Sequence, residues 1–301
     1  MSILKVILLA IVQGLAELLP VSSSAHVIVA EKLMGLDPSS PQMTLLLVML
    51  HTGTMFAVIV YFWKTWKQAY FSSQEAFNAF AVRILWATVL TGILGEALKK
   101  LIEKTLFHGA DKAEIEQLFG RLDLIAPALA AAGVLILIAG LYERRQQANI
   151  IPGRAVDKFI GIGTVSFSQS TWMGLVQGLA LPFRGFSRSG STISTGMLVG
   201  ATKERAERFS FAMAVVLTPA VVGVEALRLL KASHEAHAAG TAIDLHGSIV
   251  ASLLGMIFSF FAGLIALRWL SSWLENGRWY LFGIYCLVAS AVVFYLHTRG
   301  F

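Results

Sequence analysis

The chain has 301 residues, of which 56% are hydrophobic and only 14% are charged, and its mean hydropathy is +0.70. A soluble domain carries roughly 25% charged residues, so the composition excludes a soluble globular protein and indicates an integral membrane protein. The net charge of +6 would suggest a nucleic-acid partner for a soluble protein; here we assign it to basic loops beside anionic lipid, and we expect no nucleic-acid partner.

The first apolar stretch, residues 3–34, is interrupted by Pro20 and by the polar residues of E-L-L-P-V-S-S-S-A-H at 17–26. Non-helical backbone survives at membrane depth only where it is buried in protein or lines a wet cavity. We therefore predict a re-entrant hairpin of two short helices whose polar tip lies within the bilayer. We expect no cleavage of this stretch as a signal peptide, because Glu17 interrupts its apolar run.

The rest of the chain contains six stretches long enough to cross a hydrocarbon core of about 30 Å. These spans are 43–63, 80–98, 123–142, 209–230, 249–270 and 278–297. Between the two sets of three lies a second broken stretch, 160–200, which predicts a second re-entrant hairpin because Pro182 and G-F-S-R-S-G interrupt it. Tryptophans near span ends, Trp63, Trp66 and Trp279 among them, are predicted to lie at the membrane interface. Cys286, the one cysteine, excludes intramolecular disulfides and is expected to be a small core residue.

The two broken stretches resemble each other. V-Q-G-L-A occurs at 12–16 and again at 176–180, and each copy precedes a serine-rich break and three spans. A hairpin returns to its own side of the membrane and three crossings end on the other, so the second half should insert upside down. The predicted fold is an all-α polytopic membrane protein, an inverted repeat of two re-entrant hairpins each followed by three transmembrane helices. One membrane domain, 1–301, contains both repeats, at about 1–142 and 160–301.

The polar residues of the two tips suit a phosphate ligand if the tips meet. Arg184 and Arg188 carry planar guanidinium groups that bind phosphate oxygens in pairs, and helix N-termini near Ser23 and Gly190 would attract an anion. A hydroxyl beside an imidazole and a carboxylate supplies a nucleophile and its base.

Three interpretations stay open at this stage. The serines are also typical helix caps, and Arg184 could instead pair structurally with Glu17. His51, within the span 43–63, either lines the cavity or packs in the core. Gln13 and Glu17 share a helix face at i,i+4, where their oxygens could hold a divalent cation, Mg²⁺ or Ca²⁺.

At these residues the sequence resembles the bacterial undecaprenyl-diphosphate phosphatase family, also called the bacitracin-resistance protein family. The family motif E-G-x-x-E-x-x-P-V-S-S-x-x-H stands here as Q-G-L-A-E-L-L-P-V-S-S-S-A-H at 13–26. The second motif, P-G-x-S-R-S-G-x-T, stands as R-G-F-S-R-S-G-S-T at 184–192. The order and spacing of the motifs extend the resemblance over nearly the whole chain.

The resemblance implies removal of the terminal phosphate of undecaprenyl diphosphate, which regenerates the lipid carrier for cell-wall synthesis and confers bacitracin resistance. It implies a divalent cation, Mg²⁺ or Ca²⁺, held by Glu17 and Gln13. By motif match the catalytic residues are Ser23 as nucleophile, Glu17 as acid-base or metal-linked carboxylate, His26 as proton-transfer partner and Arg188 as ligand of the diphosphate. The substrate-binding residues are Ser22, Ser187, Ser189, Thr192 and Arg184.

The chain departs from the family pattern at two of these positions. The first glutamate of the family motif is Gln13, whose amide oxygen would bind a hard cation more weakly, and the proline before G-F-S-R-S-G is Arg184. The second tip is also one residue longer than usual.

The rival function is a flippase or transporter of an anionic polyprenyl phosphate lipid, because transporters also use inverted repeats and re-entrant hairpins. The implied location is the bacterial cytoplasmic membrane with the site facing the exterior. A small excess of lysine and arginine on the loops at 64–79, 143–162, 201–208 and 271–278 agrees with that orientation. Beyond the lipid substrate and membrane lipids, a homodimer is left open.

Overall fold

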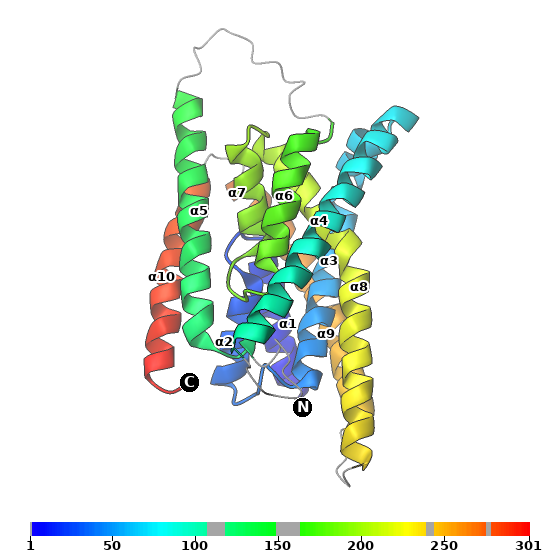
Figure 1. Ribbon diagram of the computed structural model, residues 1–301, viewed down its shortest axis with the longest axis vertical. Coiled ribbons are helices and arrows are strands. Elements are labelled where there is room, and N and C mark those ends of the chain that lie inside the picture. Colours follow the sequence, from blue (N-terminus) through cyan, green and yellow to red (C-terminus); the bar gives the residue numbers. More distant parts are fainter. Residues whose placement is uncertain (1, 107–117, 149–162, 239–243, 275–277) are drawn as a thin grey trace.

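The computed structural model describes residues 2–106, 118–148, 163–238, 244–274 and 278–301, and its regular elements within these ranges are all α-helices (Figure 1). Six helices are long and apolar enough to cross a membrane; five contain their predicted spans, and the sixth begins one residue after its predicted start at 278. They are α3 (Pro41–Tyr70), α4 (Gln74–Leu106), α5 (Leu122–Ala148), α8 (Lys203–Ala238), α9 (Leu245–Leu274) and α10 (Trp279–Thr298). The prediction of a polytopic all-α membrane protein is therefore confirmed.

Four helices are too short to span. They are α1 (Ile3–Glu17), α2 (Ser23–Leu33), α6 (Phe167–Ala180) and α7 (Arg188–Leu198), with 15, 11, 14 and 11 residues. At 1.5 Å per residue even the longest covers only about 22 Å. Pro20 and Pro182 follow the ends of α1 and α6, where proline cannot continue a helix. The sequence thus forms a helical hairpin at each predicted break, and residues 160–162 of the second stretch lie outside the described residues.

The two hairpins enter the bundle from opposite ends. In Figure 1, α1 and α2 occupy the lower half of the molecule and α6 and α7 the upper half. The repeated V-Q-G-L-A segments make comparable contacts: a Cβ on Gly14 of α1 would lie 2.4 Å from Cβ of Ala262 in α9, and one on Gly178 of α6 would lie 2.9 Å from the Thr91 carbonyl oxygen in α4. Each glycine lets its hairpin approach the second long helix of the other half. These parallels agree with an inverted repeat, which stays a prediction.

The long helices separate a protein-facing side from a lipid-facing side. Large apolar side chains such as Leu85, Leu227 and Ile265 are more than half exposed, as expected for residues in contact with lipid tails. Cys286 is fully buried, with its sulfur 3.5 Å from the Pro20 carbonyl oxygen, so the prediction of a core residue is confirmed.

The prediction of an interfacial tryptophan belt is wrong for two of the three residues named above. Trp63 is 55% exposed, but Trp66 is 6% exposed and Trp279 is 2% exposed. Trp66 stacks on Phe62, and the indole N–H of Trp279 donates to Ser194 Oγ at 3.0 Å. Both residues lie near the ends of their helices, α3 and α10, but they face the protein and not the lipid.

Candidate active site

The two hairpin tips meet through matching serines. Ser22 and Ser187 are the N-cap residues of α2 and α7, and they are the only non-glycine residues with positive φ in the described part of the chain, at 65° and 35°. The Ser22 N–H donates to Ser187 Oγ at 3.2 Å, and that oxygen also accepts from the Gly190 N–H at 3.2 Å. Such backbone costs about 1–3 kcal/mol per residue and concentrates at functional sites.

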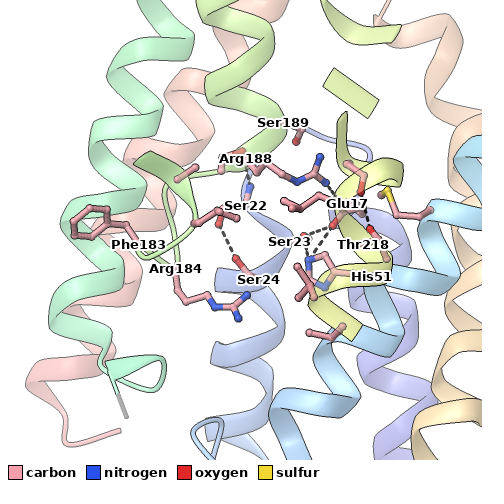
Figure 2. A pocket seen from close by; sticks show the side chains of 18 residues that line it. Glu17, Ser22, Ser23, Ser24, His51, Phe183, Arg184, Arg188, Ser189 and Thr218 are labelled. Carbon is pink, nitrogen blue, oxygen red and sulfur yellow. Dashed lines mark hydrogen bonds and ion pairs between the residues drawn. The ribbon is translucent and has the colours of Figure 1, made fainter. Parts of the chain in front are cut away.

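A cavity of about 140 Å³ lies where the tips meet. Its polar wall comes from both hairpins and α3, and Figure 2 shows these side chains turned toward a common space. They are Glu17, Ser22, Ser23, Ser24, His51, Arg184, Ser187, Arg188 and Ser189. The rest of the lining is mainly apolar and comes largely from α3 and α8, including Val48, Met55, Leu217 and Val221. The site can therefore receive an anionic group that is joined to an apolar chain.

Glu17, the last residue of α1, is the centre of the polar network. Its side chain is 3% exposed. Its Oε1 accepts from Arg188 Nη2 at 2.6 Å, and its Oε2 accepts from Ser23 Oγ at 2.5 Å and from Gln13 Nε2 at 2.8 Å. One carboxylate thus joins the hydroxyl of the first tip to the guanidinium of the second.

His51 of α3 stands beside the same hydroxyl. Its Nε2 lies 3.4 Å from Ser23 Oγ and 3.3 Å from Glu17 Oε2, while its Nδ1 lies 2.8 Å from the Leu47 carbonyl oxygen. A carbonyl oxygen only accepts, so Nδ1 carries a proton, and Nε2 stands between the Ser23 hydroxyl and the Glu17 carboxylate. The structure therefore favours the cavity-lining interpretation of His51.

The two arginines reach the cavity from the second tip. Arg188 begins α7, and its second terminal nitrogen, Nη1, has no hydrogen-bond partner among the residues that the structure describes. Arg184 lies on the α6–α7 loop, and its guanidinium carbon is 4.0 Å from the ring centroid of Phe119. In Figure 2 the two guanidinium groups lie on opposite sides of the Ser22–Ser24 segment, Arg188 above and Arg184 below. The starts of α2 and α7 add partial positive charge at the same place.

Most of the predicted site residues are brought together. Glu17, Ser22, Ser23, Arg184, Ser187, Arg188 and Ser189 line one cavity, and Gln13 contacts Glu17 directly behind it. The ion pair that the structure gives Glu17 is with Arg188 of the second tip.

His26 and Thr192 do not line the cavity. His26 Nδ1 lies 2.8 Å from the Ser22 carbonyl oxygen, and its Nε2 lies 2.7 Å from the hydroxyl of Tyr285, on which the ring stacks. The Thr192 hydroxyl donates to the Arg188 carbonyl oxygen at 2.8 Å and lies 2.6 Å from Ser210 Oγ. His51, and not His26, places its imidazole beside Ser23. This geometry gives no support to the roles predicted for His26 and Thr192.

Comparison with known proteins gives the chain relatives over its full length. It is 55% identical over 294 residues to undecaprenyl-diphosphatase 2 of Acinetobacter baylyi, with 97% of each chain covered. It is 31% identical to undecaprenyl-diphosphatase 2 of Burkholderia ambifaria, covering 98% of this chain and 96% of that one. It is also 31% identical to undecaprenyl-diphosphatase of Acidiphilium cryptum over the whole of both chains. The model of the family described as bacitracin resistance protein BacA matches residues 6–292, and the chain belongs to this family.

Proposed function

We propose that the protein hydrolyses undecaprenyl diphosphate to undecaprenyl phosphate and inorganic phosphate, and so recycles the lipid carrier of cell-wall synthesis and confers bacitracin resistance. The observation that carries the proposal is the contact of Ser23 with Glu17, whose other oxygen binds Arg188 from the second hairpin. A nucleophile, a proton acceptor and a phosphate ligand thus share one cavity. Membership of the BacA family and the names of the relatives support the same substrate.

The first step of the reaction transfers the distal phosphoryl group to Ser23. The Ser23 oxygen attacks the distal phosphorus, and its proton passes to Glu17, 2.5 Å away. The bond from that phosphorus to the bridging oxygen breaks, and the electron pair leaves with undecaprenyl phosphate. Arg188 and the N–H groups at the start of α7 stabilise the charge that develops on the phosphoryl oxygens.

The second step hydrolyses the phosphoserine. A water molecule attacks the same phosphorus and gives one proton to a base, for which His51 Nε2 is in position because it lies 3.4 Å from Ser23 Oγ. The phosphorus–serine bond breaks, the serine oxygen regains the proton held by Glu17, and inorganic phosphate leaves with the proton that His51 took from the water. The net reaction consumes one water and leaves the protein unchanged.

The cavity also accounts for a lipid-linked substrate. The apolar residues Leu217 and Val221 of α8 and Met55 of α3 line the same cavity as the polar residues of the tips. A diphosphate at the tips would leave its first isoprene units against these residues, where burial of each CH₂ contributes about 0.8 kcal/mol.

We further propose that the protein lies in the bacterial cytoplasmic membrane with this cavity reached from the exterior. This orientation is supported by the small excess of lysine and arginine on the loops that would face the cytoplasm, which are 64–79, 143–162, 201–208 and 271–278. A membrane-impermeant maleimide should label Thr298→Cys in intact spheroplasts and should label Ser72→Cys only after lysis. Both side chains are exposed, at opposite ends of the bundle. The reverse pattern would contradict the orientation.

The function is tested by phosphate release from undecaprenyl diphosphate in detergent. Ser23→Ala should lower kcat by at least about 10³-fold, because the nucleophile is lost. Ser24→Ala is the matched control: it removes a neighbouring hydroxyl that has a 3.5 Å contact with Ser22 and no contact with Glu17, and it should keep most of the activity. Hydrolysis that is absent in folded wild-type protein, with lipid transport that survives Ser23→Ala, would favour the flippase instead.

A further inference from the structure

The site differs from the family motifs at two positions that change its charge in the same direction. Gln13 stands where the motif has glutamate, and Arg184 stands where it has proline. Each change raises the formal charge by one. We propose that the positive charge a divalent cation would bring to this site is supplied by Arg184 together with Arg188, and that this phosphatase works without a bound divalent cation. The proposal rests on the proposed hydrolysis of a diphosphate.

The carboxylate expected to bind a cation is already saturated by donors. Glu17 accepts from Arg188 on one oxygen and from Ser23 and Gln13 on the other, with His51 Nε2 at 3.3 Å. A cation on either oxygen would displace at least one of these contacts. The ion pair with Arg188 also balances the single negative charge, so little attraction for a cation remains.

The second expected ligand presents the wrong atom. Gln13 Nε2 lies 2.8 Å from Glu17 Oε2 and 3.5 Å from Thr54 Oγ1. The Thr54 hydroxyl donates to the His51 carbonyl oxygen at 2.8 Å, so its oxygen is free to accept from the amide. A cation shared by Gln13 and Glu17 would require the amide oxygen of Gln13 to point toward Glu17. In that orientation the amide oxygen would lie against two hydrogen-bond acceptors, Glu17 Oε2 and Thr54 Oγ1. Gln13 therefore occupies with an N–H donor the place where a carboxylate pair would hold a metal.

The surroundings offer no replacement set of ligands. Within the ranges that the structure describes, no three His, Cys, Asp or Glu side chains lie close enough together to hold a metal ion. Ca²⁺ takes six to eight oxygen ligands and Mg²⁺ requires a near-ideal octahedron of them. The remaining side-chain oxygens of the cavity are hydroxyls of serines and of Thr218, which are neutral. The donor set here does not fit the expected divalent cation.

Two contacts hold Arg184 where it can supply the positive charge that a divalent cation would bring. Its guanidinium stacks on Phe119, and it interacts electrostatically with Glu31 of α2, a carboxyl that is fully buried. The side chain lines the same cavity as Arg188 and faces it across the serines of the first tip (Figure 2). A guanidinium carries a permanent charge and a planar fork of donors that matches phosphate oxygens. The two arginines thus offer two fixed positive charges to one diphosphate.

The experiment compares wild type with Arg184→Gln and with the double variant Gln13→Glu/Arg184→Pro, which restores the family motif at both positions. Calorimetric titration with Mg²⁺ or Ca²⁺ measures cation binding without reference to activity, and phosphate release is measured with and without EDTA. Arg299→Gln, an exposed arginine at the chain end, is the matched control for loss of one charge.

We expect wild type to show no stoichiometric cation binding and to lose no activity in EDTA. Arg184→Gln should lose about 10²-fold in kcat, as for other removed donors that stabilise a transition state, whereas Arg299→Gln should not. The double variant should bind a cation and become sensitive to EDTA. Stoichiometric cation binding by wild type, or activity that EDTA abolishes and Mg²⁺ or Ca²⁺ restores, would overturn the inference and leave the phosphatase function standing. Absence of phosphate release under every condition would refute the function, and the titration would still decide the cation question.

Discussion

Replacing Glu17 by glutamine tests whether one carboxylate both organises and activates the site. Glutamine keeps the size of the side chain, but it is neutral and has one acceptor oxygen instead of two. Arg188, 20% exposed and 2.6 Å from Glu17, would lose its counter-charge. Breaking a buried pair in this way costs about 3–5 kcal/mol, and we expect the lower end because Arg188 borders a polar cavity.

The catalytic loss should be larger than the loss of stability. Ser23 would lose its proton acceptor at 2.5 Å, an effect typically worth about 10²–10⁴-fold in rate. The assay is kcat and KM for phosphate release, with thermal unfolding measured in the same detergent. We expect kcat to fall by that factor and the midpoint of unfolding to fall as well.

A matched control separates this effect from the general loss of a buried carboxylate. Glu225 of α8 is 5% exposed and lies 3.8 Å from Arg228, but it does not line the cavity. Glu225→Gln should lower stability and leave kcat unchanged. If Glu17→Gln keeps the wild-type kcat, or if the two variants lose the same amount of activity, the reasoning about Glu17 is refuted.

Three further predictions follow from single contacts. His51→Gln should lower kcat by about 10²-fold, because the imidazole beside Ser23 is lost; an unchanged rate of phosphate release would remove His51 from the mechanism. Ser187→Ala should lower the free energy of unfolding by about 1 kcal/mol through loss of the α7 cap and of its contact with Ser22, as measured by thermal unfolding, and equal stability would contradict this. Gly14→Ala places a Cβ 2.4 Å from Ala262 Cβ and should lower the free energy of unfolding by about 1–3 kcal/mol. Gly92→Ala is the control, because its Cβ would meet no atom of another part of the described chain within 4 Å. Equal unfolding midpoints for the two variants would refute this packing.

The six long apolar helices and the two broken stretches could be predicted from the sequence. Hydropathy over a span of about 20 residues decides which segments cross, because unpaired backbone in hydrocarbon is too costly. Prolines and serines decide where the two short stretches break. The same reasoning predicted that Glu17, Ser23, Arg184 and Arg188 would meet, since each lies at or beside a tip.

The direction that each side chain faces around its helix could not be predicted in the same way. α3 is apolar on nearly every side, so its composition does not reveal that His51 faces the cavity and Trp66 the core. The left-handed conformation of Ser22 sets how α2 begins, and the motif alone does not show that His26 then lies against Tyr285. The sequence feature that favoured a cavity-lining His51 is the polar H-T-G-T run at 51–54, within a span.

The predicted cation site at Gln13 and Glu17 depends on a similar detail, the orientation of the Gln13 amide. The i,i+4 spacing of Gln13 and Glu17 correctly predicted that the two side chains meet. Spacing does not tell whether the amide offers its oxygen or its nitrogen, and that depends on the hydroxyl of Thr54 in another helix.

The most direct test of the account is to trap the phosphorylated enzyme. Protein mixed with undecaprenyl diphosphate that carries ³²P in its distal phosphate is quenched in acid within one turnover, and the labelled peptide is identified by mass spectrometry. The account predicts a phosphate on Ser23 in wild type, more of it in His51→Gln because the second step is slowed, and none in Ser23→Ala. Phosphate release in the burst without label on Ser23, or label on another residue, would contradict the claim that Ser23 is the nucleophile.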